Sequence, residues 1–420
     1  MTTAICPHTT DRLSTRLMIV TAIALMAVML LVNASTATAS DPGPKTVRNG
    51  ATPQNGISHI ELTEQWRRGD EDDDLFFGLI SAVETDGEGN LYLLDSQLST
   101  IYVLDSQGEF LRQIGHEGEG PGEFRRARSL IQHADGNMGV IQRFPGSIVN
   151  LTTDGIPAGV ILPGDPVTGG RDMLAGARIA PDGLVLCGAH MTRTDNGRLR
   201  RNFLSLYGVD GIVRIEYFGQ DDDFDFGDNH FNEANQFWIG DGLWDVLPDG
   251  RVVTGRTRDD YSITMFETDG TPSLTFSREA ESPKRSPEEL DRLETRWKSN
   301  RRFQRFGTEQ VFDPANPMLN LVRSRDGEIW VLPSDGQRGQ PDGILQTWDI
   351  FLENGTWDRQ VAVRGPGDGL RDRVFFLGHQ RVLIVAGFQD ALDAIDGVSS
   401  DDDDAESDAA PIEVILYQIN

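Results

Sequence analysis

The chain has 420 residues and carries 66 acidic against 38 basic side chains, which gives a formal net charge of −28 at pH 7. Such a charge argues against nucleic acids and anionic membrane surfaces as partners, because their phosphate groups would be repelled. One of the two cysteines, Cys6, lies in an N-terminal leader. Cys187 therefore has no partner for an internal disulfide, and the fold must depend on a buried core.

Residues 1–39 have the pattern of a secretory signal peptide. The apolar run LMIVTAIALMAVMLLV, at residues 17–32, is short for crossing a bilayer, and ATA at residues 37–39 has the small-x-small pattern of a cleavage site. We expect cleavage after residue 39, export to the periplasm or the extracellular space, and no membrane insertion afterwards. An uncleaved N-terminal anchor is the alternative. Residues 40–55 are predicted to form a flexible linker.

An Asp-Gly turn followed by a β-rich run recurs along the rest of the chain. It occurs at Asp86, Asp135, Asp182, Asp249 and Asp326. Asp-Gly between apolar runs is a hairpin signal, because both turn residues tolerate a positive φ. A second turn follows most of these, so that each unit predicts a meander of four strands.

Six such units fit a β-propeller, whose sheets bury both faces against their neighbours. The first unit reads LISAVETD, NLYLLD, TIYVLD and EFLRQIG from its inner to its outer strand. The last supplies three strands, RVFFLG, RVLIVAG and PIEVILYQIN, whereas GISHIELTEQW near the N-terminus is a strand without a unit. We predict that residues 56–420 form an all-β, six-bladed propeller of four-stranded antiparallel blades, in which the N-terminal strand closes the ring.

The segment YVLDSQGEFLRQIGHEGEGPGEF, at residues 102–124, resembles the repeat of bacterial exported six-bladed propellers related to the NHL repeat family. Those repeats pair a Tyr-Val-x-Asp strand with a glycine-rich connection that ends in Gly-x-Phe. The resemblance covers residues 80–124 and returns around 319–333. In the rest of the chain, the resemblance is limited to the turns and the spacing of the strands.

The glycines of this segment raise the alternative of a phosphate-binding loop. Such a loop opens a helix, whose free backbone amides meet the anion. Here EFRRARSLIQHADG follows, which leads into a strand, and Pro121 removes one amide donor. We therefore interpret residues 115–122 as the connection between two blades.

A helix is predicted within residues 283–310, between the fourth and fifth blades. Ser286 is a suitable N-cap, Pro287 suits the first helical position, and Glu289 completes a capping box. The insertion either braces one face of the ring or covers the central opening. In the second case Arg296 and the arginines that follow would offer charge to an anionic ligand.

Three acidic stretches are predicted to lie in loops. They are residues 69–74, 221–228 and 399–408. The alternating carboxylates of Asp221, Asp223 and Asp225 suit calcium, although the glycine and the final glutamate of an EF-hand loop are missing. Calcium is a secondary expectation, and no other cofactor is predicted. The last stretch belongs to an acidic, solvated loop at about residues 392–410.

Candidate ligand-binding residues lie in the connections that lead into the predicted inner strands, where propellers expose their channel mouth. They are Arg126, Arg171, Asp172, Trp238, Asp241, Asn320, Arg371 and Asp372. Together they offer basic, acidic, amide and aromatic groups to a polar ligand. Any one of them could instead form a salt bridge between blades.

We predict an exported, non-catalytic binding or interaction module whose partner is a protein, a peptide or a carbohydrate. The resemblance also implies an alternative, a metal-dependent hydrolase or lyase in the central channel, as in related lactonases and amidating lyases. A metal site needs several converging ligands, and only His133 and His379 occupy comparable repeat positions. No catalytic residue and no metal ligand is therefore assigned. A structural subunit of a cell-surface assembly is the third possibility.

Overall fold

A computed structural model describes residues 43–164, 172–193, 197–225, 230–233, 240, 242–299, 309–378, 380–396 and 412–420. The chain divides into two units, residues 1–45 and 46–420, and the sheets belong to the second. The predicted signal peptide lies outside the described residues.

Strands dominate the described residues, which confirms the all-β prediction. One four-stranded sheet holds β3 (Ile80–Thr85), β4 (Leu91–Asp95), β5 (Thr100–Leu104) and β6 (Phe110–Ile114). A second holds β7 (Ala127–Gln132), β8 (Met138–Gln142), β9 (Ser147–Leu151) and β10 (Pro157–Ile161). A third holds β11 (Asp172–Ala180), β12 (Gly183–Arg193), β13 (Gly197–Tyr207) and β14 (Val213–Asp225).

The remaining sheets are larger or smaller than four strands. A five-stranded sheet holds β16 (Trp244–Val246), β17 (Val252–Gly255), β18 (Ser262–Phe266), β19 (Pro272–Arg278) and, beside β19, β1 (Lys45–Asn49). An eight-stranded sheet holds, in spatial order, β21 (Leu319–Arg325), β22 (Glu328–Pro333), β23 (Ile344–Phe351), β24 (Trp357–Arg364), β2 (Ile57–Arg68), β27 (Glu413–Ile419), β26 (Arg381–Ala386) and β25 (Arg373–Leu377). A parallel pair holds β15 (His230–Asn232) and β20 (Glu309–Val311).

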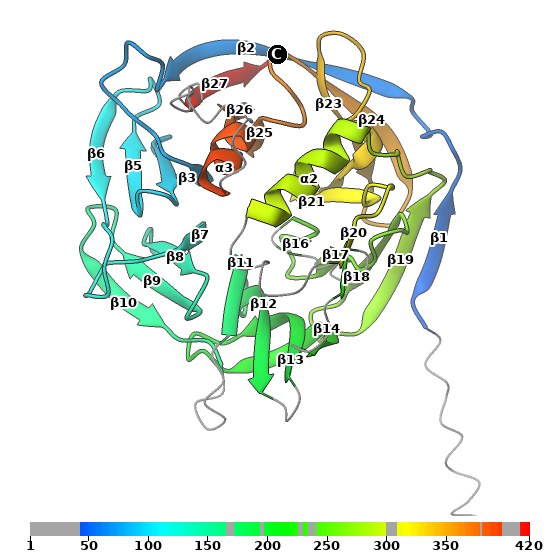
Figure 1. The fold of residues 1–420 in the computed structure, drawn as a ribbon, viewed down its shortest axis with the longest axis horizontal. Helices are drawn as coiled ribbons and strands as arrows, with labels where there is room; N and C mark the ends of the chain where they lie inside the picture. Colours follow the sequence, from blue (N-terminus) through cyan, green and yellow to red (C-terminus); the bar gives the residue numbers. More distant parts are fainter. Residues whose placement is uncertain are drawn as a thin grey trace, which may run out of the picture. The chain divides into compact units, whose positions relative to one another are not determined.

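The sheets of residues 46–420 are arranged around a common centre (Figure 1). The first strand of each meander lies innermost, and such strands contact their counterparts in the next sheet, as β3 does with β7 and β7 with β11. The helices α2 (Pro287–Ser299) and α3 (Phe388–Asp396) lie over this centre in the view of Figure 1. A short 3-10 turn, η3 (Ser334–Gly336), follows β22.

The core lies between neighbouring sheets. All five residues of β4 are buried, and the first four alternate between two apolar clusters. Leu91 and Leu93 pack in a cluster with residues of β26 and β27, whereas Tyr92 and Leu94 pack with residues of β7, β8 and β9. Successive side chains of a strand point to opposite faces, so an unbroken apolar run indicates a strand covered on both sides. The outer strand β6 is mostly exposed.

The long strand β2 has two partners. Its first half, Ile57–Glu61, pairs in parallel with β24, and its second half, Leu62–Arg68, pairs antiparallel with β27. It thereby joins the two halves of the eight-stranded sheet.

The five predicted Asp-Gly hairpins are present, between β3 and β4, β7 and β8, β11 and β12, β16 and β17, and β21 and β22. At two of the five, the glycine amide donates to the carbonyl three residues earlier, Gly136 to His133 and Gly250 to Leu247. These glycines have a positive φ, whereas Asp326, at 52°, is the one aspartate of the described residues that does. Most of the aspartates therefore do not adopt the positive φ that they tolerate. The bonds and the positive φ of Gly136 and Gly250 are typical of a type I turn followed by a left-handed glycine.

Other local predictions are confirmed or corrected. The helix predicted after Ser286 is present as α2, and its capping box forms, with the Glu289 amide 3.2 Å from Ser286 Oγ and the Ser286 amide 2.8 Å from Glu289 Oε2. The connection at residues 115–122 leads from β6 to β7 without a helix, as predicted. The predicted linker at 40–55 is corrected, because it contains β1.

The predicted acidic loop at 392–410 is also corrected, because α3 occupies its first residues. The helix begins before the acidic run. Phe388, Ala391 and Leu392 pack against the apolar cluster between the sheets of β3–β6 and β25–β27. Their helical spacing gives α3 one apolar face, which the neighbouring acidic run concealed in the sequence. Residues 397–411 lie outside the described residues.

Candidate functional site: a basic pocket between two helices

The predicted ligand residues that the structure describes lie where the first strands of several meanders begin. They are Arg126 before β7, Asp172 at the start of β11, Asn320 in β21, and Arg371 and Asp372 before β25. The other three, Arg171, Trp238 and Asp241, lie outside the described residues. Arg126 is exposed and has a positive φ of 52°.

Asp172 pairs with a histidine. Its carboxylate lies 2.7 Å from Nδ1 of His190, which faces it from β12. Burial raises the pKa of the Asp172 carboxyl above its ordinary value, although the hydrogen bond with His190 opposes the shift. A pocket lies between α2 and α3, and neither Asp172 nor His190 is among the residues that line it.

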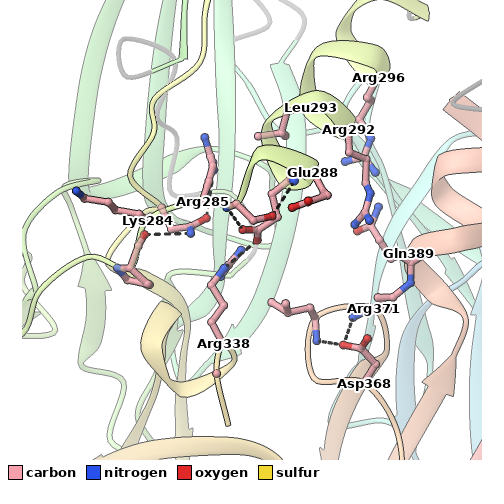
Figure 2. A pocket seen from close by; sticks show the side chains of 16 residues that line it. Lys284, Arg285, Glu288, Arg292, Leu293, Arg296, Arg338, Asp368, Arg371 and Gln389 are labelled. Atoms are coloured by element: carbon pink, nitrogen blue, oxygen red, sulfur yellow. Dashed lines mark hydrogen bonds and ion pairs between the residues drawn. The ribbon is translucent and has the colours of Figure 1, made fainter.

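That pocket has a volume of about 630 Å³. Its walls come from residues 283–286, one side of α2, the loop at 368–371 and Gln389 of α3, with Asn316, Arg338 and Gly339 completing the lining. Figure 2 shows side chains from these separate segments arranged around a shared space. A volume of this size suits a small-molecule ligand.

Of the described residues predicted at the channel mouth, Arg371 lines the pocket, and so does Arg296, which was predicted to offer charge if the inserted helix covers the centre. Asn320 does not line the pocket but helps to hold the loop at 368–371 in place. Its amide donates to Gln337 over 2.6 Å, and Gln337 donates to the Gly369 carbonyl over 2.9 Å. Asp372 fixes the same loop by accepting the Asp368 amide at 2.7 Å and the Gly387 amide at 3.0 Å. Burial raises the pKa of the Asp372 carboxyl.

Basic side chains dominate the lining. They are Lys284, Arg285, Arg292, Arg296, Arg338 and Arg371. The acidic lining residues are Glu288, Glu289 and Asp368. The described lining residues include no histidine, cysteine or aromatic side chain. The pocket is therefore suited to binding a charged ligand rather than to stacking against an aromatic ring of a ligand.

Most of these residues gave no usable signal in the sequence. Arg292 precedes Arg296 by one helical turn, so the two share a side of α2, and this spacing could have revealed it. Arg338 follows a short 3-10 turn and Gln389 belongs to a helix that was not predicted. These residues come together only because segments far apart in the chain fold against one another, and no local sequence pattern predicts such contacts.

Residues 221–225 of the acidic segment proposed for calcium belong to a strand, and residues 226–228 lie outside the described residues. Asp221, Asp223 and Asp225 end β14, where they oppose Arg201, Leu199 and Gly197 of β13. The Asp221 carboxylate accepts a hydrogen bond of 2.8 Å from Arg201. Within the described part of the chain, no three His, Cys, Asp or Glu side chains are grouped as metal ligands. Calcium binding here stays a prediction.

Comparison with known proteins supports the fold. A family model described as a six-bladed β-propeller matches residues 71–152, which confirms the resemblance seen in the sequence. No curated protein matches the chain. None of the helices in the described residues has the length and apolar character needed to cross a bilayer.

Several solved structures are similar to this chain. A candidate exported protein from Bacteroides fragilis is 14% identical, with a TM-score of 0.46, over 90% of this chain and 100% of that one. Virginiamycin B lyase from Staphylococcus aureus is 9% identical, with a TM-score of 0.41, over 86% and 99%. The calcium-binding protein regucalcin from Agrobacterium tumefaciens is 12% identical, with a TM-score of 0.39, over 86% and 95%. At these scores none of the three bears on activity or ligand.

Proposed function

We propose that this chain is an exported six-bladed β-propeller that acts as a non-catalytic binding module. Five groups of four consecutive strands support the blade number, and β25, β26 and β27 take β2 as their fourth strand. Trp66 and Arg68 of β2 also donate to the carbonyls of Ser106 and Gly108, over 3.2 and 2.7 Å. These contacts tie β2 to the first sheet, as a strand that closes a ring would require. The leader at residues 1–39 supports export.

The proposed binding site is the pocket between α2 and α3. The observation that carries the proposal is that both helices depart from the repeated meander and yet line one pocket. Loops and insertions on a rigid scaffold are where binding residues concentrate in proteins. The ligand would lie beside the start of β21 and β25, the end of the sheets where the sequence places its candidate residues.

A substitution that fills the pocket tests this proposal. Leu370 lines it and is 42% exposed, so Leu370→Trp should narrow the pocket without disturbing the core. Leu352, 37% exposed and outside the lining, gives the matched control Leu352→Trp. We expect thermal-shift screening of sugars, peptides and organic acids to find a compound that stabilises the wild type and the control but not Leu370→Trp. Equal stabilisation of all three proteins by every active compound would refute the pocket as the binding site.

A further inference from the structure

We propose that the ligand of this pocket is a small organic anion that carries two or more carboxylate or phosphate groups. This inference rests on the proposed binding function. It begins from the reversal of charge between the pocket and the chain as a whole. The chain carries 66 acidic against 38 basic side chains. The pocket instead brings six basic residues together with three acidic ones.

The acidic residues of the lining are engaged by the protein itself. Glu289 accepts hydrogen bonds from the Ser286 amide and from Arg338, over 2.8 and 3.1 Å. Asp368 accepts the amide of Leu370 over 2.8 Å. Hydrogen bonds to its own backbone and to the Ser286 hydroxyl lower the pKa of Glu288. A cationic ligand would therefore have to compete with these internal donors.

Four of the basic residues already have acidic partners. Arg285 donates to Glu233 over 2.8 Å and Arg338 to Glu289, while Arg296 pairs with Asp393 and Arg371 with Asp390. These ion pairs fix the guanidinium groups in place and balance much of their charge.

Lys284 and Arg292 are different. Both line the pocket and both are exposed, and among the described residues neither has an acidic side chain within ion-pair distance. Their charges are thus available to a ligand. An arginine or lysine that meets a carboxylate or phosphate forms a charge-assisted hydrogen bond, which is stronger than a neutral one.

The positions of these two residues argue for a ligand with more than one anionic group. Figure 2 shows Arg292 on the side of the pocket near Gln389 and Arg371, and Lys284 on the opposite side, beyond Arg285. A ligand with one anionic group would pair with one of these two residues. A compound with anionic groups at both ends could contact both, in a cavity of about 630 Å³.

Titration calorimetry with two anions and a neutral compound tests the inference. Citrate represents carboxylates, pyrophosphate represents phosphates, and glucose is the neutral probe, all at the same low ionic strength. We expect at least one anion to bind the wild type, and Arg292→Gln and Lys284→Gln each to weaken that binding about tenfold or more, as the loss of a hydrogen bond to a charged group implies. The anion that binds more tightly identifies the source of the anionic groups.

Lys298→Gln is the matched control. Lys298 lies on α2, pairs with Glu294 over 3.1 Å and is not part of the lining, so its loss should leave anion binding unchanged. An equal weakening by Lys298→Gln would show diffuse attraction and would overturn the inference, as would the absence of anion binding. All three substituted side chains are exposed, so the melting temperatures of the variants should match that of the wild type.

The failure of this inference can be told apart from failure of the proposed function. If a neutral compound binds the wild type but not Leu370→Trp, and neither anion binds, then the pocket is a binding site for a ligand of another class. If no compound distinguishes Leu370→Trp from Leu352→Trp, the proposed function fails as well.

Discussion

A buried carboxylate links two of the sheets at the scale of single residues. Asp349 of β23 is fully buried and accepts hydrogen bonds from Arg278 at 2.6 Å, Tyr261 at 2.7 Å and Gln360 at 2.9 Å. The Arg278 guanidinium also lies over the rings of Tyr261 and Trp357. Because Tyr261 directly precedes β18 and Arg278 ends β19, this cluster holds the five-stranded sheet against β23 and β24.

We predict that Asp349→Asn destabilises the protein by about 3 kcal/mol, the usual cost of breaking a buried ion pair. Asparagine has one acceptor oxygen where three donors converge, and Arg278, which is 6% exposed, would lose its buried partner. Denaturant unfolding measures the change. Asp210→Asn is the control, because Asp210 pairs with Arg214 at the surface, where ion pairs contribute little. Equal losses for both variants would contradict the special role of Asp349.

Among the secondary-structure elements, β2 is the strand that joins the two halves of the eight-stranded sheet. It is hydrogen-bonded on both sides, to β24 and to β27, and the pairing with β27 joins residues far apart in the chain. Its side chains are largely exposed, so backbone pairing rather than burial holds it in place.

We expect Thr63→Pro to lower stability by at least about 2 kcal/mol, because proline removes an amide donor and leaves its partner carbonyl without one. Thr63 lies opposite Gln418 within the β2–β27 pairing. Leu111→Pro provides the comparison, since Leu111 lies at an irregularity in the exposed edge strand β6. Thermal melting of the two variants gives the result. A Thr63→Pro protein as stable as Leu111→Pro would show that β2 is dispensable.

The same elements show what a sequence can and cannot predict. The strands β3 to β6 match their predicted segments, because apolar runs between turns are local signals of strands buried on both faces. The predicted hairpins are present for the same reason, although the conformation of each turn depends on the residues around the Asp-Gly pair. β1 and α3 were missed because each is stabilised by contacts with distant segments. Arg371 was found from its place before β25, whereas Lys284 and Arg292 became candidates only once α2 and α3 were seen together.

For the whole molecule, the sequence predicts export with removal of residues 1–39. In a Gram-negative expression host we expect the protein in the periplasmic fraction, with Ser40 as its first residue, because the leader ends in a small-x-small cleavage pattern. N-terminal sequencing and intact-mass measurement of that fraction check this. Recovery of the uncleaved chain from the membrane fraction would instead identify an N-terminal anchor.

The double pairing of β2 has a consequence for the order in which the protein is made and folded. Residues 57–68 leave the ribosome early, yet one of their partners, residues 413–419, is synthesised hundreds of positions later. Until then β2 has an open edge, and the contacts it makes with β27 cannot form. The meanders of neighbouring strands, such as β3–β6, can pair as they are made, whereas the pairing of β2 with β27 must wait until the last strand is synthesised. The eight-stranded sheet is therefore the part of the fold that can be completed only after the whole chain has been made.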